Sequence, residues 1–248
     1  MCSVDFMDTS LSVEEQAIAE RIQELKQQLG DDLLVLGHHY QRDSIVMHAD
    51  FLGDSFMLSQ KAAASNAKYI VFCGVHFMAE SADILTSDDQ SVVLPNLRAG
   101  CSMADMATLS EVEVAWEELL RESGLSDPIN RPNPEAPAGE NEAFLVPVTY
   151  MNSSADLKDF VGRHGGVVCT SSNAEGVLTW AFERAGPGGA VLFFPDQHLG
   201  RNTGLAMGID AERMPTWTPG VGAMGSLENA RIVPVSYTHL RAHETPCH

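Results

Sequence analysis

Long apolar runs are missing from this chain of 248 residues. A membrane-spanning helix needs about 18 consecutive apolar residues, and no such run occurs. The first residues also lack the basic start and apolar centre of a secretory signal peptide, since they carry Asp5 and Asp8 instead. We therefore predict a cytoplasmic protein with no membrane partner.

Basic side chains are also scarce. The chain has 15 Lys and Arg against 34 Asp and Glu, which gives a net charge of -19. Nucleic-acid backbones are bound by clustered Lys and Arg, so we predict no nucleic-acid partner. The negative charge of such a surface is best explained as a feature that keeps the protein soluble.

Cysteine is infrequent and irregularly placed. Five cysteines, an odd number with no C-x-x-C pair, do not describe a disulfide framework. The Walker loop, H-E-x-x-H and G-x-S-x-G are absent, so the P-loop, zinc-protease and serine-hydrolase interpretations lack support. Metal or redox chemistry at a cysteine stays open.

Short apolar runs that alternate with helical patterns dominate what is present. Residues 33–37 form a continuous apolar run, which is typical of a strand buried on both faces of a parallel sheet. The alternation favours an α/β fold with parallel sheets. The first series has predicted strands at 33–37, 68–77 and 91–94 and predicted helices at 11–29, 56–64, 78–85 and 110–122. The second has predicted strands at 144–150, 167–169 and 190–194 and helices that begin near 154 and 173.

A proline-rich stretch separates the two series. Residues 128–142 contain four prolines and one glycine, a composition typical of an exposed linker or loop. We therefore predict a first α/β domain at 10–126, a linker or insertion at 127–142 and a second α/β domain at 143–233.

Polar residues follow most of the predicted strands. Ligands of open α/β sheets bind beyond the carboxyl ends of the strands, so these residues predict a site. For a single Ser or Asn the main alternative is the ordinary role of a helix cap, and for a single His it is a loop residue. Repetition along the chain favours the site. We expect six side chains to converge on one cavity: His38, Tyr40, Ser55, Tyr150, Asn152 and Ser171.

Cys101 is the cysteine best suited to chemistry. It follows Gly100 at the point where we predict that a strand joins a helix. A thiolate at a helix N-terminus is stabilised by the helix dipole and by free N–H groups, which favours metal ligation or nucleophilic attack. The alternative is that Cys101 is an ordinary buried cysteine without a chemical role. Cys73 and Cys169 lie within predicted strands, where burial would raise the thiol pKa and disfavour ligation.

Seven short motifs stand in order along the chain. They are GHHYQ at 37–41, GDS at 53–55, FCGVHFMAE at 72–80, LPNLRAGCSMADM at 94–106, YMN at 150–152, CTSSNA at 169–174 and PDQHLG at 195–200. Together they resemble the quinolinate synthase family over residues 10–233. The resemblance implies repeated three-layer α/β domains around a pseudo-threefold axis, of which this chain would hold two of three.

The resemblance also implies a reaction. In that family iminoaspartate condenses with dihydroxyacetone phosphate to give quinolinate, phosphate and water in the biosynthesis of NAD. A [4Fe-4S] cluster on three cysteines acts as a Lewis acid, and L-aspartate oxidase would supply the iminoaspartate. Matched motif to motif, Cys101 resembles a cluster ligand, and Tyr40 and Tyr150 resemble catalytic residues. The implied substrate-binding residues are His38, Ser55, Tyr150, Met151, Asn152 and Ser171.

The resemblance stops after Val233. A family member would continue with further cysteine-bearing segments, so we predict that the third domain and two cluster ligands are absent and that the chain itself is inactive. Residues 234–248 show no regular spacing of apolar residues, and they resemble the translation of a sequencing adapter rather than natural protein. We therefore predict a non-native tail that does not pack, with a divergent natural tail as the alternative.

Two interpretations of function from other classes stay open at this point. One is a non-catalytic α/β protein that binds small anions with the same strand-end serines and holds no cluster. The other is a doubly wound enzyme in which Cys101 is a catalytic nucleophile.

Overall fold

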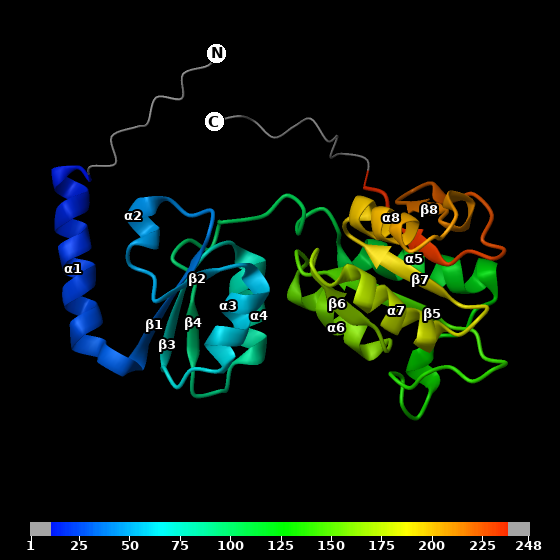
Figure 1. The fold of residues 1–248 in the computed structure, drawn as a ribbon, viewed down its shortest axis with the longest axis horizontal. Coiled ribbons are helices and arrows are strands. Elements are labelled where there is room, and N and C mark those ends of the chain that lie inside the picture. Colours follow the sequence, from blue (N-terminus) through cyan, green and yellow to red (C-terminus); the bar gives the residue numbers. More distant parts are fainter. Residues whose placement is uncertain (1–10, 238–248) are drawn as a thin grey trace, which may run out of the picture. The chain divides into compact units, whose positions relative to one another are not determined.

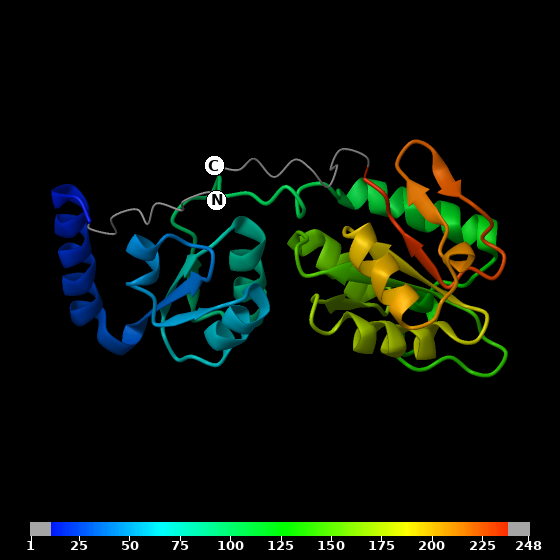
Figure 2. The same cartoon turned by 45° about the horizontal axis from the view of Figure 1, so that its top comes forward.

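The structure, a computed structural model, describes residues 11–237. These residues form two compact units that divide between Gly100 and Cys101. Each unit is built on a parallel sheet whose strands alternate with helices (Figures 1 and 2). The predicted α/β class with repeated parallel sheets is therefore confirmed. Among residues 11–237, no helix is both long enough and apolar enough to cross a membrane.

The first unit contains a sheet with the strand order β2-β1-β3-β4, in which all neighbours are parallel. Its elements are β1 (Leu33–His38), α2 (Asp43–Val46), β2 (Phe51–Gly53), α3 (Ser55–Ala63), β3 (Tyr69–Cys73), α4 (His76–Leu85) and β4 (Ser91–Val93). Helices α3 and α4 pack on one face of the sheet (Figure 1). Leu36, Ile70 and Phe72 are fully buried there, because the apolar runs of β1 and β3 place large side chains under these helices.

Helix α1 (Val13–Leu29) precedes this sheet. It begins with a capping box, in which the Ser12 hydroxyl accepts from the N–H of Glu15 and the Glu15 carboxylate accepts from the N–H of Ser12. It ends at Gly30, whose φ of 52° suits glycine. The predicted helix at 11–29 is confirmed. None of its residues is buried, however, so its apolar positions find little cover within the unit.

The second unit has helices on both faces of its sheet. Its elements are α5 (Leu109–Ser123), β5 (Leu145–Tyr150), α6 (Ala155–Arg163), β6 (Val167–Cys169), α7 (Ala174–Ala185), β7 (Ala190–Phe194), α8 (Gln197–Ala206), β8 (Thr216–Thr218), β9 (Gly222–Met224) and β10 (Ile232–Pro234). The parallel sheet has the order β10-β7-β5-β6. Leu145 points into a core shared with α5 and α6, and the next residue, Val146, points into a core shared with α7. This unit is therefore a three-layer domain.

Helix α5 belongs to the second unit. Trp116 and Leu119 pack in one core with Leu145 and Leu192. The predicted domain boundary at 126 is therefore wrong, because the apolar face of α5 is buried against the second sheet although the helix follows the first sheet in the chain.

The predicted linker at 127–142 is likewise part of the second unit. Pro128 is buried, and the N–H of Ala138 donates to the carbonyl of Glu183 at 3.0 Å. The segment is a surface excursion of this unit rather than a connection between two units.

The first residues of the predicted tail pack in the core of the second unit. Val235 is fully buried and Tyr237 is buried beside it. The N–H of Val235 donates to the carbonyl of Phe193 at 2.9 Å, and that of Ser236 to the carbonyl of Trp217 at 2.7 Å. The prediction that packing stops after Val233 is therefore wrong for residues 234–237, because they complete an edge strand. The rest of the predicted tail lies outside the described residues.

Candidate functional site

His38 ends strand β1 and is buried. Its ring packs between the rings of His39 and Tyr40, at centroid distances of 4.2 and 4.0 Å. Burial, followed by the charge of His39, lowers the pKa of His38 to about 4, although the carboxylate of Asp54 opposes this shift. His38 is therefore neutral at pH 7, where its imidazole is a weak base that serves as a hydrogen-bonding group.

Helix α3 begins beside the same strand end. The backbone N–H of His39 donates to the carbonyl of Gly53 at 3.2 Å, and its ring Nδ1 lies at the same distance from that oxygen. The N-cap of α3 is Asp54, whose carboxylate accepts from the N–H of Met57 at 2.9 Å. Asp54 rather than Ser55 therefore caps this helix. Ser55 still lies at the helix N-terminus, where the dipole favours an anion.

Cys101 opens the second unit in a turn rather than at a helix. Its carbonyl accepts from the N–H of Asp105 at 2.8 Å, and its own N–H donates to the Asp105 carboxylate at 3.1 Å. The next helix begins only at Leu109. The predicted stabilisation of a Cys101 thiolate by a helix dipole therefore does not apply. Instead, the side-chain amide of Asn152 donates to the Cys101 sulfur at 3.8 Å.

The phenol of Tyr150 lies at the carboxyl end of β5. Burial raises the pKa of Tyr150, a hydrogen bond from Ser171 opposes this, and the charge of Asp196 raises it further. The phenol therefore stays protonated at neutral pH. It is able to donate a proton to a bound molecule.

The structure thus brings the predicted residues together in two groups. In the second unit Cys101 contacts Asn152, and Tyr150 contacts Ser171. Met151, between Tyr150 and Asn152, is buried and donates its N–H to Cys169, so its side chain serves packing. In the first unit His38, Tyr40 and Ser55 lie at one strand end. The convergence of both groups on one cavity stays a prediction.

Two acidic helix caps near these groups were not among the six side chains predicted to converge on one cavity. Asp54 caps α3 and opposes the lowering of the His38 pKa, while Asp196 caps α8 and adds to the rise in the Tyr150 pKa. The Asp196 carboxylate accepts from the N–H groups of His198 and Leu199, at 3.0 Å each. The signal was available in the sequence, because each Asp stands between an apolar strand and a helical pattern, where N-caps occur.

One glycine pattern was missed as well. Residues 220–225 match the spacing G-x-G-x-x-G of dinucleotide-binding loops. The structure places them in the turn and second strand of the antiparallel β8–β9 hairpin. A dinucleotide site needs this pattern between a parallel strand and a helix, so the match is not functional here.

The fit to a metal centre is incomplete. Residues 11–237 contain no group of three or more His, Cys, Asp or Glu that could hold a metal ion. Cys101 is partly exposed, whereas burial raises the pKa of Cys169 to about 12 and also raises that of Cys73. The thiols of Cys169 and Cys73 therefore resist becoming the thiolates that a cluster needs. The described part of the chain fits one ligand of a [4Fe-4S] cluster and not a complete set.

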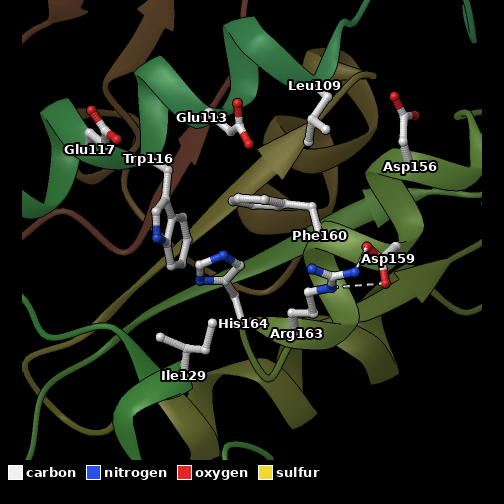
Figure 3. Close-up of a pocket in the computed structure, with 10 residues that line it drawn as sticks. All are labelled: Leu109, Glu113, Trp116, Glu117, Ile129, Asp156, Asp159, Phe160, Arg163 and His164. Carbon is white, nitrogen blue, oxygen red and sulfur yellow. Dashed lines mark hydrogen bonds and ion pairs between the residues drawn. The ribbon is translucent and has the colours of Figure 1, made fainter.

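A separate cavity of about 300 Å³ lies between α5 and α6 (Figure 3). The rings of Trp116, Phe160 and His164 pack together in its wall, with the Phe160 and His164 centroids 4.3 Å apart. The Asp127 carboxylate accepts from Trp116 Nε1 at 2.9 Å and bonds His164 Nδ1 at 2.8 Å. His164 follows α6 and precedes β6, so this polar cluster lies at the amino end of the strand, away from the predicted site.

Comparison with known proteins identifies a family and several similar proteins. The sequence model of a family described as "Quinolinate synthetase A protein" matches residues 20–236. A quinolinate synthase of Corynebacterium glutamicum is 56% identical over 218 residues, which cover 86% of this chain and 50% of that protein. One of Rhodopirellula baltica is 49% identical over 232 residues, or 89% of this chain and 54% of that protein. The chain therefore spans about half the length of the curated relatives that it matches.

Proposed function

Because this chain belongs to the quinolinate synthase family, we propose that it is part of an enzyme of NAD biosynthesis. The proposed reaction condenses iminoaspartate with dihydroxyacetone phosphate and releases quinolinate, phosphate and water. The observation that carries the proposal is the family match over residues 20–236, which includes both groups of strand-end residues. No comparison supports the alternative of a non-catalytic anion-binding protein.

The charges of the proposed substrates suit the two strand-end groups. One substrate carries carboxylates and the other a phosphate, and the N-termini of helices bind such anions through N–H groups and the dipole. Ser55 lies at the N-terminus of α3, and Ser171 lies just before α7. We assign substrate binding to these two serines, to Asn152 and to His38, whose neutral ring adds a hydrogen-bonding group.

Ring formation with loss of water requires proton transfer. The raised pKa of Tyr150 keeps its phenol protonated, so this residue is the proposed proton donor in the second unit. In the first unit Tyr40 packs against His38 and is the second proposed catalytic phenol. Tyr150 is the last residue of β5 and Tyr40 follows β1, so both lie at the carboxyl ends of parallel strands, where open α/β sheets bind ligands.

The proposed cofactor is a [4Fe-4S] cluster, with Cys101 as one ligand. Two further thiolates must come from outside residues 11–237, because burial raises the thiol pKa of both Cys73 and Cys169. We therefore expect this chain alone to hold no stable cluster and to form no quinolinate. We also propose a cytoplasmic location, with L-aspartate oxidase as the source of iminoaspartate.

The test uses a complete protein that carries these residues, reconstituted anaerobically with iron and sulfide. Quinolinate formation gives the turnover, and iron content with visible absorption gives the cluster. Tyr150→Phe should lower turnover at least about tenfold with an unchanged circular dichroism spectrum. Tyr69→Phe, at an exposed position of β3, is the matched control. Equal turnover of the two variants would overturn the role of Tyr150, and a cluster-loaded protein without quinolinate formation would overturn the function.

A further inference from the structure

The cavity between α5 and α6 has the size and the lining of a small-molecule site. Its volume of about 300 Å³ lies at the lower end of the roughly 300–1,000 Å³ that ligand sites enclose. Two aromatic rings line it, those of Trp116 and Phe160 (Figure 3). The cavity lies wholly within the second unit, and none of its lining residues belongs to the two strand-end groups. The proposed reaction therefore does not account for it.

One ring nitrogen of His164, which lines the cavity, is left for a ligand. Its Nδ1 bonds the Asp127 carboxylate at 2.8 Å, whereas no group among residues 11–237 bonds its Nε2. A carboxylate on Nδ1 holds the proton there, which leaves the Nε2 lone pair of the neutral ring as an acceptor. Asp127 also accepts from Trp116 Nε1 at 2.9 Å, so the orientation of the His164 ring is fixed. A ligand that donates an N–H would satisfy Nε2.

The charge of the lining favours a cation. Four acidic side chains and one basic side chain line the cavity: Glu113, Glu117, Asp156, Asp159 and Arg163. Four negative charges and one positive charge leave a net charge of -3 with His164 not counted. A cleft lined by one sign of charge attracts molecules of the opposite sign and repels a phosphate or a carboxylate.

The acidic groups on the α6 side are already engaged. Arg163 pairs with Asp159 at 2.8 Å, and these residues stand four apart, the spacing at which opposite charges stabilise a helix. Asp156 accepts from the hydroxyl of Ser154. The negative charge that is available to a ligand therefore comes from α5.

Helix α5 presents two carboxylates that have no partner. Glu113 and Glu117 form no ion pair or hydrogen bond with any group among residues 11–237. They stand four residues apart, so they share one face of the helix with their Cβ atoms about 5–6 Å apart. Two like charges at this spacing destabilise a helix. A molecule with two positive charges at a similar separation would remove the repulsion.

We infer that this cavity binds a linear diamine or polyamine. Two ammonium groups on a four-carbon chain are separated by about one helical turn, which matches the spacing of Glu113 and Glu117. One ammonium group also donates to Nε2 of His164. The methylene chain between the charges lies against the aromatic rings of the cavity wall, where it is shielded from water.

The experiment uses 1,4-diaminobutane as the probe and this chain as the protein. Titration at about 0.15 M salt weakens general attraction to the acidic surface. The ¹⁵N NMR signals of the histidine rings report binding at the cavity itself. The signals of His164 should move and saturate, and those of His48, which is buried in the first unit, should stay in place.

Two double substitutions then remove equal charge at equal helical spacing. Glu113→Gln with Glu117→Gln should weaken binding at His164 at least about fivefold, because two ion pairs are lost. Glu20→Gln with Glu24→Gln on α1, which lines no part of the cavity, should change it by less than about twofold at this salt concentration. Both variants alter exposed helix positions, so an unchanged circular dichroism spectrum is expected for each.

His164 signals that stay in place would overturn the inference. Equal weakening by the two double substitutions would do so as well, because only general attraction to an acidic surface would then remain. Movement of the His164 signals by inorganic phosphate and not by the diamine would identify an anion site, again against the inference. Diamine binding goes beyond the proposed function and needs neither turnover nor a cluster, so a failure of either leaves the other untouched.

Discussion

Ending the chain after Val233 should destabilise the second unit strongly. The matched reference ends after Tyr237, so that both chains lack everything that follows. The deletion removes three buried residues: Pro234 from β10, and Val235 and Tyr237 from the core that contains Trp116 and Leu145. It also removes the N–H groups that bond the carbonyls of Phe193 and Trp217.

The magnitude follows from the buried side chains. Burial of a valine stabilises by about 1.5 kcal/mol or more, and burial of an aromatic ring by about 3 kcal/mol. A compact unfolded state already buries part of this surface, which reduces the sum by roughly 10–40%. The deletion should therefore cost about 3–4 kcal/mol, a large share of the roughly 5–15 kcal/mol that stabilises an ordinary domain.

Thermal unfolding provides the assay. Trp217 is buried in the same core, so its fluorescence and the near-ultraviolet circular dichroism report on this unit. The chain that ends after Val233 should melt about 10 °C or more below the reference. Equal melting temperatures would refute the assignment of residues 234–237 to the core and would restore the interpretation as a tail that does not pack.

Three further perturbations test the electrostatics and the packing. Burial opposes the charge of Asp127, but hydrogen bonds, led by the one from His164, hold the pKa of its carboxyl below the usual range. The ionised carboxylate therefore stabilises the fold above about pH 4, and this stabilisation is lost as the pH falls through the folded pKa. Asp127→Asn should therefore cost about 1–3 kcal/mol in urea unfolding at pH 7 and less at pH 3, and an equal cost at both would contradict this. Burial lowers the pKa of His38 to about 4, so the unfolded state binds the extra proton between about pH 6.5 and 4, and stability should fall with acid across that window. Ring NMR signals of His38 should show a neutral imidazole at about pH 5.5, and a titration midpoint near 6.5 would contradict the burial argument. A Cβ at Gly166 would lie 1.9 Å from the carbonyl oxygen of Pro147, so Gly166→Ala should lower the melting temperature by several degrees, and an unchanged value would contradict this packing.

Six strands and most helices could be predicted because their burial is visible in local periodicity, whereas the short strands β2, β8, β9 and β10 were not predicted. The continuous apolar runs that became β1 and β7 are examples. The limit appears at α5, whose apolar face of Val112, Trp116 and Leu119 would look the same against either sheet. Periodicity shows that a face is buried but not what covers it, and the predicted boundary at 126 failed for this reason.

The candidate site likewise has features that could be predicted from the sequence and features that could not. Strand-end positions such as His38 and Tyr150 could be predicted, because parallel topology fixes which edge they occupy. The contact between Cys101 and Asn152 joins residues 51 positions apart, so it depends on tertiary structure that no local pattern encodes. The direction of the His38 pKa shift also depends on burial and on neighbouring charges, which appear only once the strands are paired.

The division of the chain at Gly100 sets an order of events during synthesis. Every strand of the first sheet lies before that residue, whereas the second sheet takes its last strand, β10, from residues 232–234. The first unit is therefore able to fold while the second is still on the ribosome. At about 5–20 residues per second, the remaining stretch up to residue 237 takes roughly 7–27 s to emerge. Throughout that interval the exposed apolar side chains of the first sheet, Leu52, Tyr69 and Val93, lie in solution, where transiently exposed apolar surface favours aggregation.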